Sequence, residues 1–323
     1  MKLADCRRVG ANPAAVAAGR HMAARDLSYT LTRALAGSPL GAITRRVLPP
    51  TGRRVIRSAI ELPVMRRVAA DRRSLRLLLP VTVTDGPDQS PEPVSLRLRR
   101  LPVAPVHLRP GTADVAVARD LMLKQPHLPP DSMLPDDARL VWDLGAHIGL
   151  AAAGYATRWP HARVIAVELE SLNARLCRRN LEPFGQRCEV VEAAVWHTEG
   201  EVSVGGDPDD PHTNSFRAAR GSEGITSAAV PALSLDALLA RAAPGERAVD
   251  LCKLDVEGAE RQILRENTGW ARWVRTLAVE VHDDYSPEDC RRDLERLGFE
   301  RIERGRADNI VVGQRPSTPR DTP

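Results

Sequence analysis

The sequence has little of several residue types, and each shortage narrows what the chain can be. Aromatic residues account for 3% of its 323 residues, so aliphatic side chains must fill a core. There is no run of about 18 or more uncharged apolar residues, which argues against a membrane-spanning helix. The N-terminus also lacks the compact apolar stretch and the cleavage pattern of a secretory signal peptide.

Cysteine is scarce as well. The five cysteines are odd in number and include no CxxC pair: Cys6, Cys177, Cys188, Cys252 and Cys290. This pattern argues against a disulfide framework and against a zinc site. It predicts free thiols, and we therefore expect a cytoplasmic protein.

Lysine is nearly absent, and arginine carries almost all of the positive charge. The chain has three lysines, Lys2, Lys124 and Lys253, among 46 basic residues. Residues 1–80 hold 16 basic and 4 acidic residues, a net charge of +12, whereas the whole chain carries +4, so the remainder carries −8. Such a basic arm could contact nucleic acid, an anionic membrane surface or an acidic partner. The alternative is a poorly ordered extension that is rich in arginine and alanine.

Composition and patterning divide the chain into four parts. A basic extension, disordered or partly helical, is followed by a pre-core module, a main domain and a disordered polar tail, which cover residues 1–75, 76–135, 136–313 and 314–323. In the pre-core module we expect residues 75–83 and 94–101 to pair as strands. We also expect a helix from Thr112 to about Lys124, with Thr112 as its N-cap.

The main domain alternates short apolar strands with helical segments. Strands are predicted at 140–144, 163–167, 189–195, 251–256 and 276–281, and helices at 150–158, 172–180, 235–241, 260–266 and 287–297. Such alternation is typical of a Rossmann-like α/β fold with a mostly parallel sheet that is covered on both faces. A hairpin over residues 299–304 and 309–313 would add one antiparallel strand.

The first chemical signal is a strand that ends in an acid and a turn of small residues. Residues 141–149 read VWDLGAHIG, with Asp143 ahead of Gly145 and Gly149. The glycines allow a tight turn and the close approach of a ligand at the carboxyl end of a parallel strand. The spacing is not the GxGxxG that cradles a dinucleotide pyrophosphate. It favours S-adenosylmethionine (SAM), which has no phosphate and carries ammonium and sulfonium charges that suit an acid. A plain turn is the alternative.

Glu168 gives the second signal. It directly follows the second predicted strand and lies 25 residues after Asp143, one βαβ unit away. An acid at the end of this strand can accept hydrogen bonds from both ribose hydroxyls of a nucleotide-like ligand. Glu170 is a weaker candidate for the same role, and a solvated loop acid is the alternative.

The third signal is a charged strand end. Residues 253–260 read KLDVEGAE and bring Lys253 together with Asp255, Glu257 and Glu260 at the expected rim of the crevice. Isolated charges at such a place are costly unless they are paired or used. They indicate either a functional cluster or a set of capping and salt-bridge contacts.

The next strand ends in VEVHDD, which places His282 at its carboxyl end. An unperturbed histidine titrates near neutral pH, so His282 could take the proton of an acceptor hydroxyl during methyl transfer. Asp283 or Asp284 could orient it, and a structural histidine is the alternative. We assign no metal ligands, although Mg²⁺ favours carboxylate oxygens and four acids here could hold it: Asp255, Glu257, Glu280 and Asp284.

In their order and spacing, these segments resemble the FkbM-type methyltransferases. The resemblance is carried by VWDLGAHIG, VIAVELE, VVEAAV, SLDALL, CKLDVEGAE and LAVEVH, and it covers about Leu140 to Gly313. It implies a class I SAM-dependent methyltransferase fold, whose seven-stranded sheet has one antiparallel strand. Members of the family mostly O-methylate sugars, glycolipids or polyketide natural products. This sequence departs from the family at His147, where Asn is usual, and at Leu169, where Pro is usual.

The resemblance also implies roles for individual residues. Three would line the methionine part of SAM: Asp143, Gly145 and Gly149. Glu168 would bind the ribose, and Glu192 and Ala193 would lie near the adenine. Three more would form the transfer site, with the last as the candidate base: Asp255, Glu257 and His282.

We therefore expect an O-methyltransferase for a small-molecule or glycan acceptor, with an irregular stretch over residues 205–228 that could cover the substrate. Peripheral membrane contact could occur if the acceptor is a lipid. Three alternatives stay open: an NAD(P)-dependent oxidoreductase, an RNA methyltransferase and a non-catalytic SAM-binding protein. The missing GxGxxG disfavours the first, and scarce lysines and aromatics for base stacking argue against a nucleic-acid acceptor.

Overall fold

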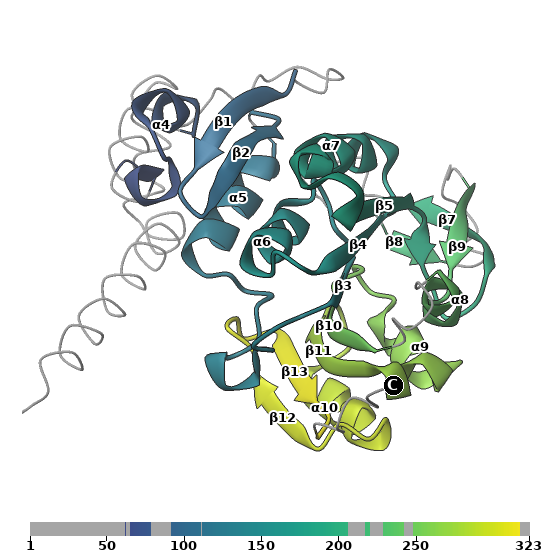
Figure 1. The fold of residues 1–323 in the computed structure, drawn as a ribbon. Coiled ribbons are helices and arrows are strands. Elements are labelled where there is room, and N and C mark those ends of the chain that lie inside the picture. Colours follow the sequence, from purple (N-terminus) through teal and green to yellow (C-terminus); the bar gives the residue numbers. More distant parts are fainter. Residues whose placement is uncertain are drawn as a thin grey trace, which may run out of the picture. The chain divides into compact units, whose positions relative to one another are not determined.

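A computed structural model describes residues 62, 65–78, 92–110, 112–205, 217–219, 229–241 and 248–316 (Figure 1). The chain divides into two units, Met1–Arg66 and Arg67–Pro323, and only Leu62, Met65 and Arg66 of the first are described. Most of the predicted basic extension, most of the 205–228 stretch and most of the predicted tail lie outside the described residues. No described helix is long and apolar enough to cross a membrane.

The second unit is built around a seven-stranded sheet with the order β12-β13-β11-β10-β3-β4-β5 (Figure 1). Its strands are β3 (Leu140–Leu144), β4 (Arg163–Glu168), β5 (Cys188–Glu192), β10 (Val249–Leu254), β11 (Val274–Glu280), β12 (Arg301–Arg304) and β13 (Ile310–Gln314). β13 runs antiparallel to both of its neighbours, and the other pairings in this sheet are parallel. The predicted Rossmann-like class I sheet with one antiparallel strand is confirmed.

The inner strands are buried on both faces, as their sequences require. All five residues of β3 and all six of β10 are buried. Continuous apolar runs of this kind are typical of parallel strands that have helices on both sides. Asp250 lies near the start of β10, and two further charged residues, Asp143 in β3 and Lys253 in β10, are partners in the strand register. Asp143 and Lys253 lie at the carboxyl ends of these strands. They mark the place where the sheet carries polar chemistry.

Five helices of the main domain agree with the predictions to within one residue at each end. They are α6 (Leu150–Arg158), α7 (Ser171–Leu181), α8 (Leu235–Ala240), α9 (Glu260–Arg265) and α10 (Pro287–Arg296). Three begin with side-chain caps, which fix where each helix starts. Glu170, Ser234 and Ser286 accept hydrogen bonds from amides in the first turns of α7, α8 and α10.

A second sheet, which the sequence pattern did not reveal, follows β5. It has the order β6-β9-β7-β8, with β6 (Ala194–Val195), β7 (Gly200–Gly205), β8 (Arg217–Ala219) and β9 (Ala229–Leu233). The prediction of a single strand over residues 189–195 was wrong, because β6 leaves the central sheet and pairs with β9. The break falls at Ala193, whose amide donates to the Glu168 carbonyl at 3.1 Å.

The segment before the central sheet contains α4 (Arg72–Leu78), β1 (Val94–Leu98), β2 (Leu101–Leu108) and α5 (Asp114–Leu123). The predicted pairing of residues 75–83 with 94–101 was wrong, because β1 pairs with β2 in a hairpin and residues 72–78 are helical. Asp71 caps that helix, since its carboxylate accepts a 2.7 Å hydrogen bond from the Ser74 amide. The predicted helix after Thr112 is α5, but Thr112 is not its N-cap, because the helix begins at Asp114 and Ala113 occupies the N-cap position without a side-chain cap.

Asn180 of α7 fastens the β1–β2 hairpin to the main domain. Its Oδ1 accepts from the His107 amide at 2.7 Å, and its Nδ2 donates to the carbonyls of His107 and Ile148 at 2.9 and 2.8 Å. A buried amide with all of these partners has its hydrogen bonds satisfied, and it holds β2 in a fixed position against α7. The hairpin therefore rests on the helix that follows β4.

Candidate active site

Gly145 and Gly149 form the turn between β3 and α6, and both have left-handed backbone conformations, with φ of +77° and +79°. A Cβ atom on Gly145 would lie 1.7 Å from the Asp255 carbonyl oxygen, and one on Gly149 would lie 2.7 Å from Cys177 Sγ. The protein's own packing thus requires both glycines. Gly145 brings the turn after β3 against the turn after β10, where an open α/β sheet binds its ligand.

Lys253 ties these two turns together. Its Nζ lies 3.1 Å from Asp143 Oδ1 and 3.2 Å from Asp255 Oδ2, and it donates to the Gly145 carbonyl at 2.6 Å. Burial alone would lower the pKa of Lys253, but the two carboxylates outweigh it and raise that pKa well above its usual value. Lys253 is therefore a permanent cation between two predicted site acids.

Glu168 ends β4 with both carboxylate oxygens held by backbone amides. Oε2 accepts from the His147 amide at 2.7 Å, and Oε1 accepts from the Glu170 amide at 2.9 Å. Burial raises the pKa of this carboxyl, and the two amide hydrogen bonds oppose the shift. The arrangement holds the carboxylate in one orientation beside the glycine turn, as a ribose-binding acid requires.

His147, in the same turn, has a left-handed backbone with φ of +51°. Its Nε2 lies 3.3 Å from Oδ1 of Asp114, a buried acid whose two oxygens accept from the Arg109 guanidinium at 2.8 and 2.9 Å. Burial lowers the pKa of His147 to about 4, so the ring is neutral at neutral pH. The histidine thus links the glycine turn to the segment before the central sheet.

The other predicted cofactor residues lie next to Glu168. Glu192 of β5 is its register partner, and buried Ala193 follows it. The Glu192 carboxylate accepts from Ser171 Oγ at 2.5 Å and from Arg178 at 3.0 Å, and the Ser171 contact lowers its pKa most. Glu170, the weaker ribose candidate, is engaged as the cap of α7.

His282 follows β11 and faces the turn after β10. Its Nδ1 lies 2.9 Å from Oε1 of Glu260, a fully buried acid that also accepts from two amides of that turn, at 3.0 and 2.9 Å. An ionised carboxylate only accepts, so Nδ1 carries a hydrogen, and Nε2 faces Asp255 and Glu257 at 3.6 and 3.5 Å. Burial lowers the pKa of His282, but Glu260 and the other acids outweigh it and raise it to about 9. The three predicted transfer-site residues come together here.

The expectation that Asp283 or Asp284 orients His282 was wrong, because Glu260 does so. The Asp284 side chain is 83% exposed and pairs with Arg261 at 3.0 Å. Of the four acids that were named as potential Mg²⁺ ligands, Asp284 therefore does not lie with the other three. The sequence analysis placed Glu260 only among the charges at the rim of the crevice. Its burial and its contact to His282 show that it orients the histidine.

His127 joins the cluster from a distant part of the sequence. Its Nδ1 lies 3.4 Å from Glu280 Oε2, and its Nε2 lies 3.8 Å from Asp255 Oδ2. Asn309 holds Glu280 from the other side, because its Nδ2 donates to Oε1 at 2.9 Å. Burial lowers the pKa of His127 to about 4 and raises that of Glu280 to about 7. His127 lies in the proline-rich stretch after α5, where no local pattern marks a site residue.

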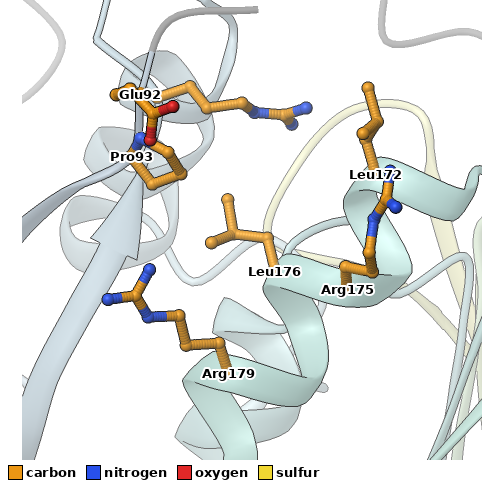
Figure 2. A pocket seen from close by; sticks show the side chains of 7 residues that line it. Glu92, Pro93, Leu172, Arg175, Leu176 and Arg179 are labelled. Atoms are coloured by element: carbon orange, nitrogen blue, oxygen red, sulfur yellow. The ribbon is translucent and has the colours of Figure 1, made fainter.

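A separate cavity of about 280 Å³ lies between α7 and the start of β1 (Figure 2). Its walls combine arginines and one glutamate with apolar side chains: Glu92, Pro93, Arg109, Leu172, Arg175, Leu176 and Arg179. It contains none of the predicted cofactor or transfer residues. The candidate active site is therefore the group of turns at the carboxyl ends of β3, β4, β10 and β11.

Residues 143–301 match the family described as the methyltransferase FkbM domain. The chain contains an FkbM methyltransferase domain. The matched range begins at Asp143 and includes Glu168, Asp255 and His282. The family and the class I fold together imply SAM binding and SAM-dependent methyl transfer. None of the curated proteins matches the chain.

Solved structures that resemble the FkbM domain have low sequence identity to it. Precorrin-6y C5,15-methyltransferase from Geobacter metallireducens is 15% identical with a TM-score of 0.35, over 57% of this chain and 85% of that one. The METTL16 methyltransferase domain is 13% identical with a TM-score of 0.36, over 56% and 60%. The mitomycin 7-O-methyltransferase MmcR is 14% identical with a TM-score of 0.31, over 55% and 49%. Likenesses at this level say nothing about the substrate of this chain.

Proposed function

We propose that the FkbM domain transfers the methyl group of SAM to a hydroxyl oxygen of a sugar, glycolipid or polyketide-type small molecule. The observation that carries this proposal is the position of His282, which faces Asp255 and Glu257 while Glu260 holds its other ring nitrogen. Methylation of a hydroxyl needs a group that takes the hydroxyl proton, and an oriented imidazole is suited to that task. The family supports methyl transfer in general.

The residues present suit SAM. Glu168, fixed by two amides, would accept hydrogen bonds from the ribose hydroxyls, with Glu192 and Ala193 beside the adenine. The acids Asp143 and Asp255 share the single ammonium of Lys253, so the crevice keeps negative charge that a cationic ligand would balance. When bound, SAM would supply a methyl group on a positively charged sulfur, so that an oxygen–carbon bond can form while the carbon–sulfur bond breaks and S-adenosylhomocysteine leaves.

The protein's own part is alignment and proton transfer. The acceptor hydroxyl passes its proton to Nε2 of His282, which leaves the oxygen with the electron pair that forms the new bond. Because its pKa is raised to about 9, His282 is protonated at neutral pH in the free protein and must first lose that proton. The positive charge of the bound cofactor favours the loss. Glu260 then stabilises the imidazolium that the reaction forms.

The competing functions are less well supported. An oxidoreductase disagrees with the family match over residues 143–301. An RNA acceptor calls for stacking side chains and a basic surface, whereas the chain has 3% aromatics and its positive charge is concentrated in residues 1–80. A non-catalytic SAM-binding protein has no need for the His282–Glu260 pair. Contact with a membrane follows from the proposal only if the acceptor is a lipid.

The proposal is tested by calorimetric titration of the full chain with S-adenosylhomocysteine, with NADH as control, followed by transfer of a labelled methyl group to sugars, glycolipids and polyketide alcohols. The full chain should bind S-adenosylhomocysteine and methylate an alcohol. His282→Gln should lose transfer but keep the affinity for S-adenosylhomocysteine. Binding of NADH alone, transfer to RNA alone, or unchanged transfer by His282→Gln would each contradict the proposal.

A further inference from the structure

We propose that His127, Asp255 and Glu280 form a binding site for one divalent first-row transition-metal ion. The three side chains come from separate parts of the fold: the stretch after α5, the turn after β10 and the end of β11. One ligand atom of each lies within 4.8 Å of the others. Neither the cofactor site nor the proton transfer proposed above uses His127.

The distances within this group are not those of direct hydrogen bonds. The two ring nitrogens of His127 face carboxylate oxygens at 3.4 and 3.8 Å, beyond the usual range of about 2.7–3.2 Å. No hydrogen bond joins the His127 ring to another described residue. A neutral imidazole carries a single N–H, so one of its nitrogens would present a lone pair to a carboxylate. One of the two carboxylates therefore faces the ring without a hydrogen bond from it.

An ion between these groups would remove the conflict. With metal–ligand bonds of about 2.0–2.2 Å in tetrahedral geometry, neighbouring ligand atoms are separated by roughly 3.3–3.6 Å. The 3.4 Å between His127 Nδ1 and Glu280 Oε2 lies in that range. The 3.8 Å contact of Asp255 is to the other ring nitrogen, so a shared ion would bind a single nitrogen of His127 together with the two carboxylates, whose ligand atoms lie within 4.8 Å of it and of each other. Small rotations of the side chains would bring these three atoms to the spacing that the ion needs.

The outer contacts of the carboxylates support the same assignment. Asn309 donates to the Glu280 oxygen that does not face His127, and Lys253 lies 3.2 Å from Asp255 Oδ2. Partners of this kind orient metal-binding carboxylates. A second group, Asp255, Glu257 and His282, has similar spacing. We assign the ion to the first group because His282 has Glu260 as a partner within the protein, whereas the His127 ring has no such partner among the described residues.

The ligand types select the class of metal. One imidazole with two carboxylates suits zinc, manganese, iron or cobalt, whereas magnesium favours oxygen ligands and retained waters. The group thus points away from Mg²⁺, which the acids alone could hold. If the proposed O-methylation is correct, on which this step rests, the ion would lie next to His282 and could bind the acceptor oxygen. Acceptors with a second oxygen beside the reacting hydroxyl would then be preferred.

The site is tested on the full chain after treatment with a chelator. Cobalt(II) is added as a spectroscopic probe and its visible absorption is recorded, and zinc(II) affinity is measured by calorimetry. The wild type should bind about one ion per chain, and His127→Ala and Glu280→Gln should each weaken the affinity at least about tenfold. The matched control is His161→Ala, which removes an exposed histidine from the turn before β4 and should bind like the wild type.

Each variant is also titrated with S-adenosylhomocysteine, which separates this inference from the proposed function. Retained S-adenosylhomocysteine binding with lost metal binding in His127→Ala supports the site and shows that the variant is folded. If His127→Ala does not fold, Glu280→Gln provides the same comparison. Two results would overturn the inference: a wild type that binds no ion, or a His282→Ala variant that loses the ion while His127→Ala retains it. A wild type that binds metal but not S-adenosylhomocysteine would instead contradict the proposed function.

Discussion

Lys253 and Asp143 are register partners on adjacent parallel strands, and their charged groups lie 3.1 Å apart inside the sheet. The same ammonium reaches Asp255 at 3.2 Å and the Gly145 carbonyl at 2.6 Å. One buried cation therefore holds Asp143, the glycine turn and Asp255 in a single arrangement. Stability and site geometry are coupled through this side chain.

Replacement of Lys253 by methionine should be strongly destabilising, because it leaves two acids without their cation in a buried place. We expect Lys253→Met to lower the free energy of unfolding by about 3–5 kcal/mol, measured by urea denaturation. The control is Lys124→Met, which removes a 40% exposed lysine that pairs with Asp120 at 3.5 Å and should change stability by less than about 1 kcal/mol. Equal stabilities for the two variants would mean that the buried ion pair contributes little.

Gly145 should tolerate no side chain. A Cβ at this position would meet the Asp255 carbonyl at 1.7 Å, and the backbone is left-handed. Gly145→Ala should therefore cost at least about 2 kcal/mol and weaken the binding of S-adenosylhomocysteine, measured by thermal melting and calorimetry. Gly154→Ala is the matched control, because Gly154 lies in α6 with open space around it. That variant should be neutral or more stable by up to about 1 kcal/mol. Loss of stability in the control alone would contradict the packing argument.

The parts of the site that the sequence predicted are those set by local pattern. Asp143 and Glu168 end consecutive parallel strands, and in such a sheet the strand ends meet at one edge. Their proximity therefore follows from the order of strands and helices alone. The same logic places Asp255 and His282 after β10 and β11, where the structure brings them within 3.6 Å.

The parts that the sequence did not predict depend on contacts between distant segments. His127 lies in a stretch with no regular pattern, and only the folded chain brings it to Asp255 and Glu280. The sequence does not distinguish Glu260 from the other acids of residues 253–260. Its complete burial and its 2.9 Å contact to His282 are visible only in the folded chain. The second sheet was missed because β6 has two residues and pairs with β9, far along the chain.

Glu168 should matter for cofactor affinity. We expect Glu168→Gln to weaken the binding of S-adenosylhomocysteine at least tenfold, because hydrogen bonds to a charged acceptor contribute about 1.5–3 kcal/mol each. The amide nitrogen of glutamine would also face a backbone donor, since both carboxylate oxygens now accept from amides. Glu170→Gln, two residues away, alters the cap of α7 and should leave the affinity within about twofold. Calorimetry compares the two, and a larger loss in the Glu170 variant would reverse the assignment.

His147 should make the protein sensitive to acid. Its pKa in the folded protein is lowered to about 4, mainly by burial, whereas in the unfolded chain it is near 6.5. The unfolded state therefore binds a proton first, and folding stability falls as the pH drops from about 6.5 toward 4, by about 2–3 kcal/mol at the lower end. His147→Asn restores the residue usual in FkbM methyltransferases and removes this titration. Urea denaturation at pH 7 and pH 4.5 should show a smaller loss of stability for the variant than for the wild type. Equal losses would mean that the buried ring gains its proton without cost, and that the 3.3 Å contact to Asp114 compensates for burial.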